Sequence, residues 1–250
     1  MSIELAVIGG TGLYRFSGLE DIESNHVDTP YGKPSGDIVV GSIAGKRVAF
    51  LARHGEGHSI APHRINYRAN VWALHRVGAR RIVGINAVGG IREDMGPRVL
   101  AVPDQLIDYT SGRLTSFSDA EGADVKHIDF SDPYSATLRA ALISAARTAG
   151  IAVVDGGCYG ATQGPRLETR AEIARLRRDG CDLVGMTGMP EAALARELEC
   201  DYACLALVAN WAAGCSDAVE ISLPEIFANL EAATAEVPKI VGALLDPDGI

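Results

Sequence analysis

Several short clusters of glycine, hydroxyl, basic and amide residues carry the side chains that could do chemistry, and most of them follow an apolar run. The first, residues 9–12 with the sequence GGTG, comes directly after the run at residues 5–8. Glycines there let the backbone approach an anion, and Thr11 can add a hydroxyl to a nest of N–H groups. A simple tight turn would use the same residues. The dinucleotide fingerprint is excluded, because it needs glycine where the chain has Arg15.

A second cluster occupies residues 53–58 with the sequence RHGEGH. Arg53 and His54 are adjacent at the predicted end of a strand and are followed by glycines. They can bind phosphate through positively charged side chains, with the arginine supplying paired donors. His54, His58 and His63 could instead bind a metal ion. The glycines and the proline between them deny the helix that would align histidines four residues apart, so we expect no metal here.

Further clusters place amide, hydroxyl and acidic groups near the ends of other apolar runs. They are residues 86–90 (NAVGG), 163–170 (QGPRLETR), 186–191 (MTGMPE) and Asn210. Thr187 and Glu191 could serve only to cap a helix. Asn210 follows a buried run and must find a partner, which could be a purely structural hydrogen bond. Taken singly, none of these clusters specifies a reaction.

The elements that must position these clusters alternate between short apolar runs and longer helical patterns. We predict strands at residues 5–8, 48–51, 81–85, 183–184 and 203–208, and helices at 66–77, 136–148, 170–179, 191–198 and 223–245, the last bent or interrupted near Pro238. Residues 111–132 lack periodicity and are predicted to form a long loop with a functional or interface role. The alternation indicates a single α/β domain over residues 1–250, with a central mixed β-sheet flanked by helices.

Composition narrows the possible partners. Hydrophobic residues make up 47% of the 250 residues and charged residues 22%, which is typical of a globular domain with a full core. The formal charge of −9 argues against a nucleic-acid partner, since such proteins need a surplus of basic residues. No apolar run approaches the ~20 residues that span a bilayer, and the start lacks a basic segment, so we expect a cytoplasmic protein. The five cysteines are expected to be reduced.

Together and in order, the clusters resemble the purine nucleoside phosphorylase and methylthioadenosine phosphorylase family. The motifs that carry the resemblance are GTG at 10–12, RHG at 53–55, His58 with NYRAN at 66–70, GPR at 164–166, and MT and PE within 186–191. The resemblance implies a nucleoside phosphorylase-like fold and the cleavage of an N-glycosidic bond by phosphate. Inorganic phosphate would be a co-substrate, with no metal or organic cofactor.

The resemblance also implies which residues contact phosphate and sugar. The expected phosphate ligands are Thr11, Arg53, His54, the backbone of Ala87 and Thr187. Met186 would pack against the ribose. This arrangement suits the chemistry, because the enzyme must hold an anionic nucleophile below C1′ while the bond stretches toward an oxocarbenium ion. Fixing phosphate against the sugar supplies much of the rate gain through orientation.

Departures from the methylthioadenosine enzymes indicate the base. Those enzymes have a carboxylate at the position of Asn210 and another two residues later, where this chain has Ala212. An amide both accepts and donates, so Asn210 can accept from a protonated N7 and donate to O6 of a 6-oxopurine. Glu168 matches the glutamate that purine nucleoside phosphorylases use against N1–H, and Leu167 beside it is expected to contact substrate. The expected catalytic residues are therefore Asn210, Glu168 and His54, and the expected base is hypoxanthine or guanine.

The 5′ end of the sugar is indicated by apolar residues. Leu223 and Ile226 fall where the methylthioadenosine enzymes surround the methylthio group, although ordinary core positions of a helix would have the same spacing. His127 matches a residue that the family contributes from a neighbouring subunit, which implies a homotrimer or a hexamer made of two trimers. The combination predicts 5′-methylthioinosine as substrate. Inosine or guanosine, and methylthioadenosine, remain the alternatives.

Overall fold

The computed structural model of the chain describes residues 2–119, 122–216 and 222–246. Its described residues form one mixed sheet of eleven strands. The strands are β1 (Leu5–Gly9), β2 (Glu20–Asn25), β3 (Ile38–Ile43), β4 (Lys46–Ala52), β5 (Arg81–Gly90), β6 (Leu100–Val102), β7 (Gln105–Asp108), β8 (Val153–Asp155), β9 (Cys158–Ala161), β10 (Leu183–Gly185) and β11 (Asp201–Trp211). The predicted α/β class with a central mixed sheet is confirmed.

Strand β5 is where the sheet divides. Along one edge it pairs in parallel with β11 over nearly its whole length. Along the other edge, residues 82–84 pair in parallel with β1, whereas Gly89 and Gly90 pair antiparallel with β10. Residues 85–88 therefore lie between the two partner strands. In open α/β sheets such a division leaves a crevice where ligands bind, so this part of β5 is the expected place for a site.

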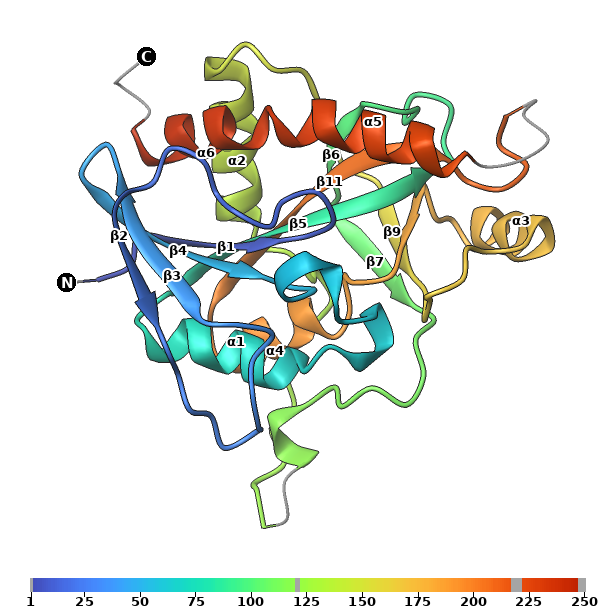
Figure 1. The fold of residues 1–250 in the computed structure, drawn as a ribbon. Helices are drawn as coiled ribbons and strands as arrows, with labels where there is room; N and C mark the ends of the chain where they lie inside the picture. Colours follow the sequence, from blue (N-terminus) through green and yellow to red (C-terminus); the bar gives the residue numbers. More distant parts are fainter. Residues whose placement is uncertain (1, 120–121, 217–221, 247–250) are drawn as a thin grey trace.

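Helices cover both faces of the sheet (Figure 1). Below it in that view lie α1 (Tyr67–Arg76) and α4 (Glu191–Glu197), and above it lie α2 (Ala136–Thr148), α5 (Leu223–Thr234) and α6 (Val237–Leu245). Two hydrophobic clusters fill the space between sheet and helices, one on each face. The central strands are buried on both sides, which explains why β1 and β11 are continuous apolar runs rather than alternating ones.

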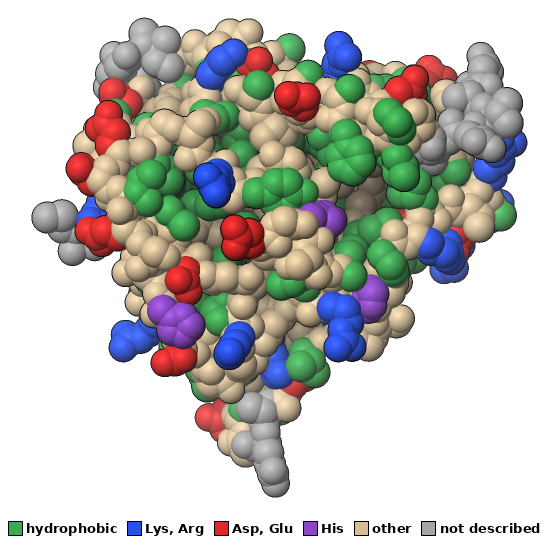
Figure 2. All heavy atoms as spheres, viewed as in Figure 1, with side chains coloured by type: hydrophobic (Ala, Val, Ile, Leu, Met, Phe, Trp, Pro, Cys, Tyr) green, Lys and Arg blue, Asp and Glu red, His purple; other side chains and the backbone are tan. Residues whose placement is uncertain are grey.

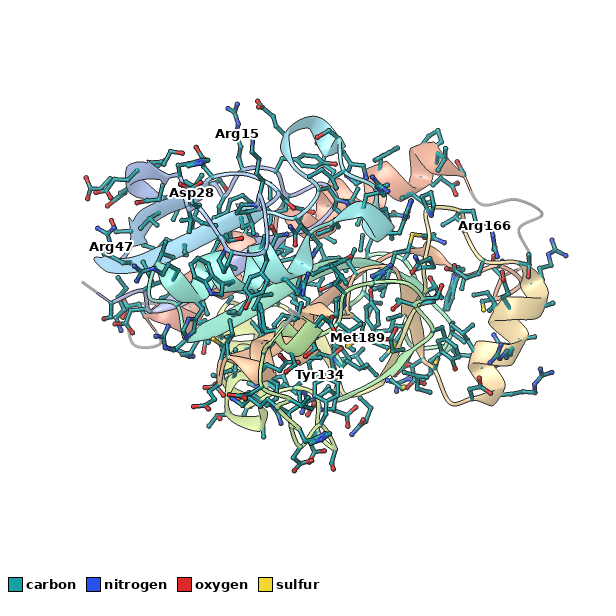
Figure 3. The ribbon with its side chains drawn as sticks, turned by 90° about the horizontal axis from the view of Figure 1, so that it is seen from below. Arg15, Asp28, Arg47, Tyr134, Arg166 and Met189 are labelled. Carbon is teal, nitrogen blue, oxygen red and sulfur yellow. The ribbon has the colours of Figure 1, made fainter. Side chains whose placement is uncertain are left out.

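The remaining helix, α3 (Arg170–Arg178), lies at one end of the molecule, with Arg166 close to its start (Figure 3). Thr169 begins it with a capping box, because its side chain accepts from the Glu172 N–H while the Glu172 carboxylate accepts from the Thr169 N–H. A small hydrophobic cluster that includes Ile173, Leu176 and Val184 packs α3 against the sheet. This cluster backs the end of the sheet where β10 meets β5.

The predicted elements are present, and the differences have local causes. The last predicted helix is two helices, and Pro238 lies in the first turn of α6, where no N–H is required. Strands β2, β3 and β6 to β9 were not predicted. Most of them are short, and β2 is largely exposed, so their periodicity is weak. Within residues 111–132 the described part contains only a short 3-10 turn at Phe117–Asp119. Among the described residues, no helix has both the length and the apolar character that a membrane span requires.

Candidate active site

A cavity beneath α5 collects residues from the ends of several strands, and Figure 2 shows it as a hollow rimmed by hydrophobic side chains. The lining includes most of the side chains that the sequence singled out: Thr11, His54, Ala87, Leu167, Glu168, Met186, Thr187, Asn210 and Ile226. The chain separates these residues widely, and the fold brings them together where β5 changes partners. The cavity is therefore the candidate active site.

His54 is fixed in the cavity wall by the loop that follows β4. Gly55 and Gly57 have φ angles of 70° and 63°, a region that L side chains rarely adopt. Ile60 closes the loop: its N–H donates to the His54 carbonyl at 2.9 Å, and its carbonyl accepts from Nδ1 of His54 at 2.8 Å. Burial lowers the pKa of His54 to about 4. The imidazole is accordingly neutral at physiological pH.

Thr187 presents its hydroxyl at the same end of the cavity. The side chain is buried, and Asn86 of β5 donates from Nδ2 to the Thr187 oxygen at 2.8 Å. The Asn86 oxygen accepts in turn from the Cys204 thiol at 3.4 Å. Because the Thr187 oxygen accepts from an amide, its own hydroxyl hydrogen is left to donate to a ligand. With Thr11 and the backbone around Ala87, this hydroxyl forms a set of donors suited to an oxyanion.

Arg53 lies behind the cavity wall, which differs from the predicted direct contact with phosphate. Its side chain is 0% exposed and is absent from the lining that the described residues form. Its Nε and Nη2 donate to the two carboxylate oxygens of Glu191, each at 2.8 Å, and Nη1 donates to the Ile85 carbonyl at 2.7 Å. The arginine is thus committed to a bidentate pair inside the protein.

The Arg53–Glu191 pair holds together the segments that carry the polar groups of this end of the cavity. Arg53 immediately precedes His54, Ile85 precedes the amide of Asn86, and Glu191 follows the turn that contains Thr187. Glu191 also accepts from the Tyr202 hydroxyl at 2.8 Å. Its carboxylate therefore serves this interior network, and the helix-capping interpretation does not account for it.

The base-binding candidates lie at a more open end of the cavity. Glu168 is half-buried and lies on the loop between β9 and α3. The Thr162 hydroxyl donates to Oε1 of Glu168 at 2.6 Å, which leaves Oε2 to accept from a ligand. Leu167 lines the cavity but is 42% exposed. A carboxylate on this loop can reach the edge of a planar base in the cavity.

Asn210 owes its position to an irregularity in β11. The register with β5 shifts between Val208 and Asn210, so Val208 pairs with Val88 and Asn210 with Gly89. A bulge of this kind re-aims a side chain, and here it leaves Asn210 on the cavity wall. One N–H of its amide donates to the Trp211 carbonyl at 2.7 Å. The amide oxygen and the second N–H can then face a ligand.

The apolar end is built mainly from α5. Ile226 lines the cavity, and so does Leu230 one turn later. Leu223 does not: it is 60% exposed and lies outside the lining of the described chain, as does the exposed His127. Within one chain, then, the fold brings Ile226 but not Leu223 or His127 to the site.

The sequence interpretation named His58 only as a possible metal ligand and as part of a family motif, and it did not identify Leu230 as a lining residue. His58 lines the cavity, its ring stacks on that of His54 with centroids 4.3 Å apart, and its Nδ1 lies 3.1 Å from the Tyr14 hydroxyl. The four-residue spacing from Ile226 to Leu230 is a helical signal that could have identified the leucine. The position of His58 depends on its left-handed backbone, which no sequence pattern indicates.

Comparison with known proteins agrees with the fold. Residues 4–246 match the Phosphorylase superfamily. A protein of Xanthomonas campestris pv. campestris named probable S-methyl-5′-thioinosine phosphorylase is 62% identical, with 97% of each chain covered. A purine nucleoside phosphorylase of Streptomyces coelicolor is 48% identical, covering 97% of this chain and 87% of its own. The crystal structure of a methylthioadenosine phosphorylase sourced from an antarctic soil metagenomic library has a TM-score of 0.91 and 37% identity, covering 98% of this chain and 85% of its own. The chain belongs to the phosphorylase superfamily.

Proposed function

We propose that this chain is a nucleoside phosphorylase that cleaves S-methyl-5′-thioinosine with inorganic phosphate, giving hypoxanthine and 5-methylthioribose 1-phosphate. The observation that carries the proposal is the composition of the cavity. Oxyanion donors lie at one end of it, a carboxylate and an amide at another, and apolar side chains of α5 at a third. A nucleoside with an apolar 5′ group would need all three. The Xanthomonas relative, whose name states this activity, supports the same substrate.

At the phosphate end, inorganic phosphate is contacted directly by Thr11, His54, Thr187 and the backbone at Ala87. A phosphate oxygen attacks C1′ of the ribose while the bond from C1′ to the purine N9 breaks. The bonding electrons move into the base, and the new bond joins C1′ to the phosphate oxygen. The protein's part is to hold the nucleophile in line with the breaking bond, which Met186 supports by packing against the sugar.

At the base end, the departing purine must be stabilised as it gains electrons. As the base departs, N7 takes a proton from solvent water, so the product leaves as neutral hypoxanthine. Asn210 accepts from this N7–H through its amide oxygen and donates to O6 through the N–H that Trp211 does not use. Glu168 accepts from N1–H, with its second oxygen fixed by Thr162. Adenine has no proton on N1 and carries a donor in place of O6, so it would leave these groups unpaired.

At the 5′ end, Ile226 and Leu230 offer an apolar wall that suits a methylthio group better than a hydroxyl. We also propose that the chain forms an oligomer. Leu223 and the neighbouring Phe227, 59% exposed, would be covered by a second copy of the chain, whose His127 would reach the site in a homotrimer or hexamer. The five free thiols suit a reducing compartment, and we place the enzyme in the cytoplasm.

The test is a comparison of phosphate-dependent rates for methylthioinosine, methylthioadenosine, inosine and guanosine. We expect methylthioinosine to have the highest kcat/KM. A preference for inosine or guanosine would remove the 5′ assignment and favour the activity named for the Streptomyces relative. A preference for methylthioadenosine would remove the base assignment. The same assay with a metal chelator should leave the rates unchanged, because the proposed chemistry needs no cofactor.

A further inference from the structure

The tautomer of His54 determines which oxyanion the cavity can bind. We propose that His54 accepts a hydrogen bond from the protonated oxygen of hydrogen phosphate, and that this contact makes the site select hydrogen phosphate and arsenate over sulfate. The inference rests on the proposed function, because it concerns the co-substrate of the same site. It assigns His54 a role opposite to that of a cationic donor.

The hydrogen bond to Ile60 determines the tautomer of His54. A backbone carbonyl can only accept, so the contact of 2.8 Å between the Ile60 oxygen and Nδ1 requires the proton to be on Nδ1. The same loop is closed from the other side by the Ile60 N–H, which donates to the His54 carbonyl. Both bonds are short, and His54 is 5% exposed, so the loop fixes the orientation of the imidazole.

With the proton on Nδ1, the other ring nitrogen, Nε2, carries no proton. Among the described residues, no side chain or carbonyl pairs with it, and His54 lines the cavity. The charged and titratable groups around the ring do not favour a second proton. Arg53 is adjacent in sequence and already paired with Glu191, and His58 stacks on the ring. Burial lowers the pKa of His54; the hydrogen bond to Ile60 opposes this shift, and the charges of Arg53 and His58 add to it. Nε2 therefore offers a lone pair to the ligand.

Hydrogen phosphate and sulfate are anions of equal charge and similar shape. Hydrogen phosphate carries a hydroxyl that can donate to Nε2, and its other three oxygens remain free to accept from Thr11, Thr187 and the backbone. Sulfate has no proton at neutral pH, so one of its oxygens must lie against the Nε2 lone pair. An unmet hydrogen bond in a buried site costs enough to lower affinity about tenfold. Arsenate, which keeps a proton, should bind like phosphate.

The test is titration calorimetry of phosphate, arsenate and sulfate against the intact protein at about pH 8, above the second pKa of phosphate. We expect phosphate and arsenate to bind about tenfold more tightly than sulfate. In His54→Gln the affinity for phosphate should exceed that for sulfate by a factor of only about 1–2, because an amide can turn to donate or accept. The control, Thr187→Val, removes a donor that any oxyanion can use, so it should weaken all three anions and keep the ratio.

Three results would overturn the inference: equal binding of sulfate and phosphate by the native protein, arsenate that binds like sulfate, or an unchanged ratio in His54→Gln. Failure to bind phosphate at all would do the same. The proposed function has a separate readout, since it fails if hypoxanthine is released from methylthioinosine without phosphate. Phosphate-dependent release combined with equal sulfate binding would reject only the role given to His54.

Discussion

The phosphate end of the cavity is built differently from its base and 5′ ends. The phosphate end is made from strand ends whose polar groups are satisfied inside the protein: Glu191 holds Arg53, Asn86 holds Thr187, and Ile60 holds His54. The base and 5′ ends are made from a loop, a bulge and a helix, and several of their side chains are partly exposed. The shared chemistry thus rests on the rigid interior, whereas the choice of substrate rests on groups that can change without unfolding the sheet.

The largest expected effect comes from breaking the interior network. Glu191→Ala leaves the Arg53 guanidinium buried without its partner, and we expect the free energy of unfolding to fall by about 3–5 kcal/mol. Chemical denaturation measures this. The matched control is Glu172→Ala, which removes the partner of Arg166 in an exposed pair and should cost much less, although Glu172 also caps α3. A comparable loss in both variants would contradict the importance given to the buried Arg53–Glu191 pair.

The second effect is on turnover. Thr187→Val removes the hydroxyl that faces the cavity and leaves the Asn86 amide without its acceptor. Loss of one donor to a developing oxyanion typically lowers the rate about 100-fold, so kcat/KM for phosphate should fall by about that factor. The kcat/KM ratio between methylthioinosine and inosine should stay constant. If that ratio changed markedly while phosphate use did not, Thr187 would belong to the specificity end.

The third effect is the pH dependence of stability. Because the pKa of His54 is lowered to about 4, the unfolded chain binds the extra proton first as pH falls below the ordinary value of 6.5. The contribution of His54 is therefore fully present above about pH 7 and is lost as pH falls toward 4, which amounts to about 1–2 kcal/mol by pH 5. His54→Gln should flatten this slope. His26, whose pKa is raised by the Asp37 carboxylate, contributes in the opposite direction, so His26→Gln should not flatten it.

The smallest effect in free energy tests the specificity end. Asn210→Asp replaces the donor to O6 by an acceptor, so turnover of 6-oxopurine substrates should fall and turnover of the 6-amino substrate should improve, each by about tenfold. The free energy of unfolding should change by less than about 1 kcal/mol, because Asn210 is half-buried and forms one hydrogen bond to Trp211. An unchanged substrate preference would mean that the amide is structural.

Much of the fold could be predicted from the sequence because the central strands are continuous apolar runs and the helices begin and end with recognisable residues. The cap at Thr169 and the proline at position 238 are examples. The short strands could not be predicted, because runs such as β6 and β8 take their conformation from the strands beside them. Pairing across the sheet is a long-range property that local patterns do not encode.

Most of the residues that line the cavity could be named from the sequence, but their arrangement could not. Glycine, hydroxyl and amide residues after apolar runs indicated the cavity wall, as Thr11 and Asn210 illustrate. The sequence indicates a direct phosphate contact for Arg53, because a basic residue lies beside a phosphate motif, whereas the structure buries its side chain. Its burial depends on Glu191, far along the chain. Leu223 lies outside the cavity of the single chain and is 60% exposed, since helical spacing identifies a face of a helix but not what covers it.

The most direct test of the central claim is the kinetics of hypoxanthine release from S-methyl-5′-thioinosine and from inosine over a phosphate series. We predict no release without phosphate, a KM for phosphate that is similar for both nucleosides, and a kcat/KM at least about tenfold higher for the methylthio substrate. That result would place chemistry and selectivity at separate ends of the cavity. Release without phosphate, or an equal kcat/KM for the two nucleosides, would contradict the account.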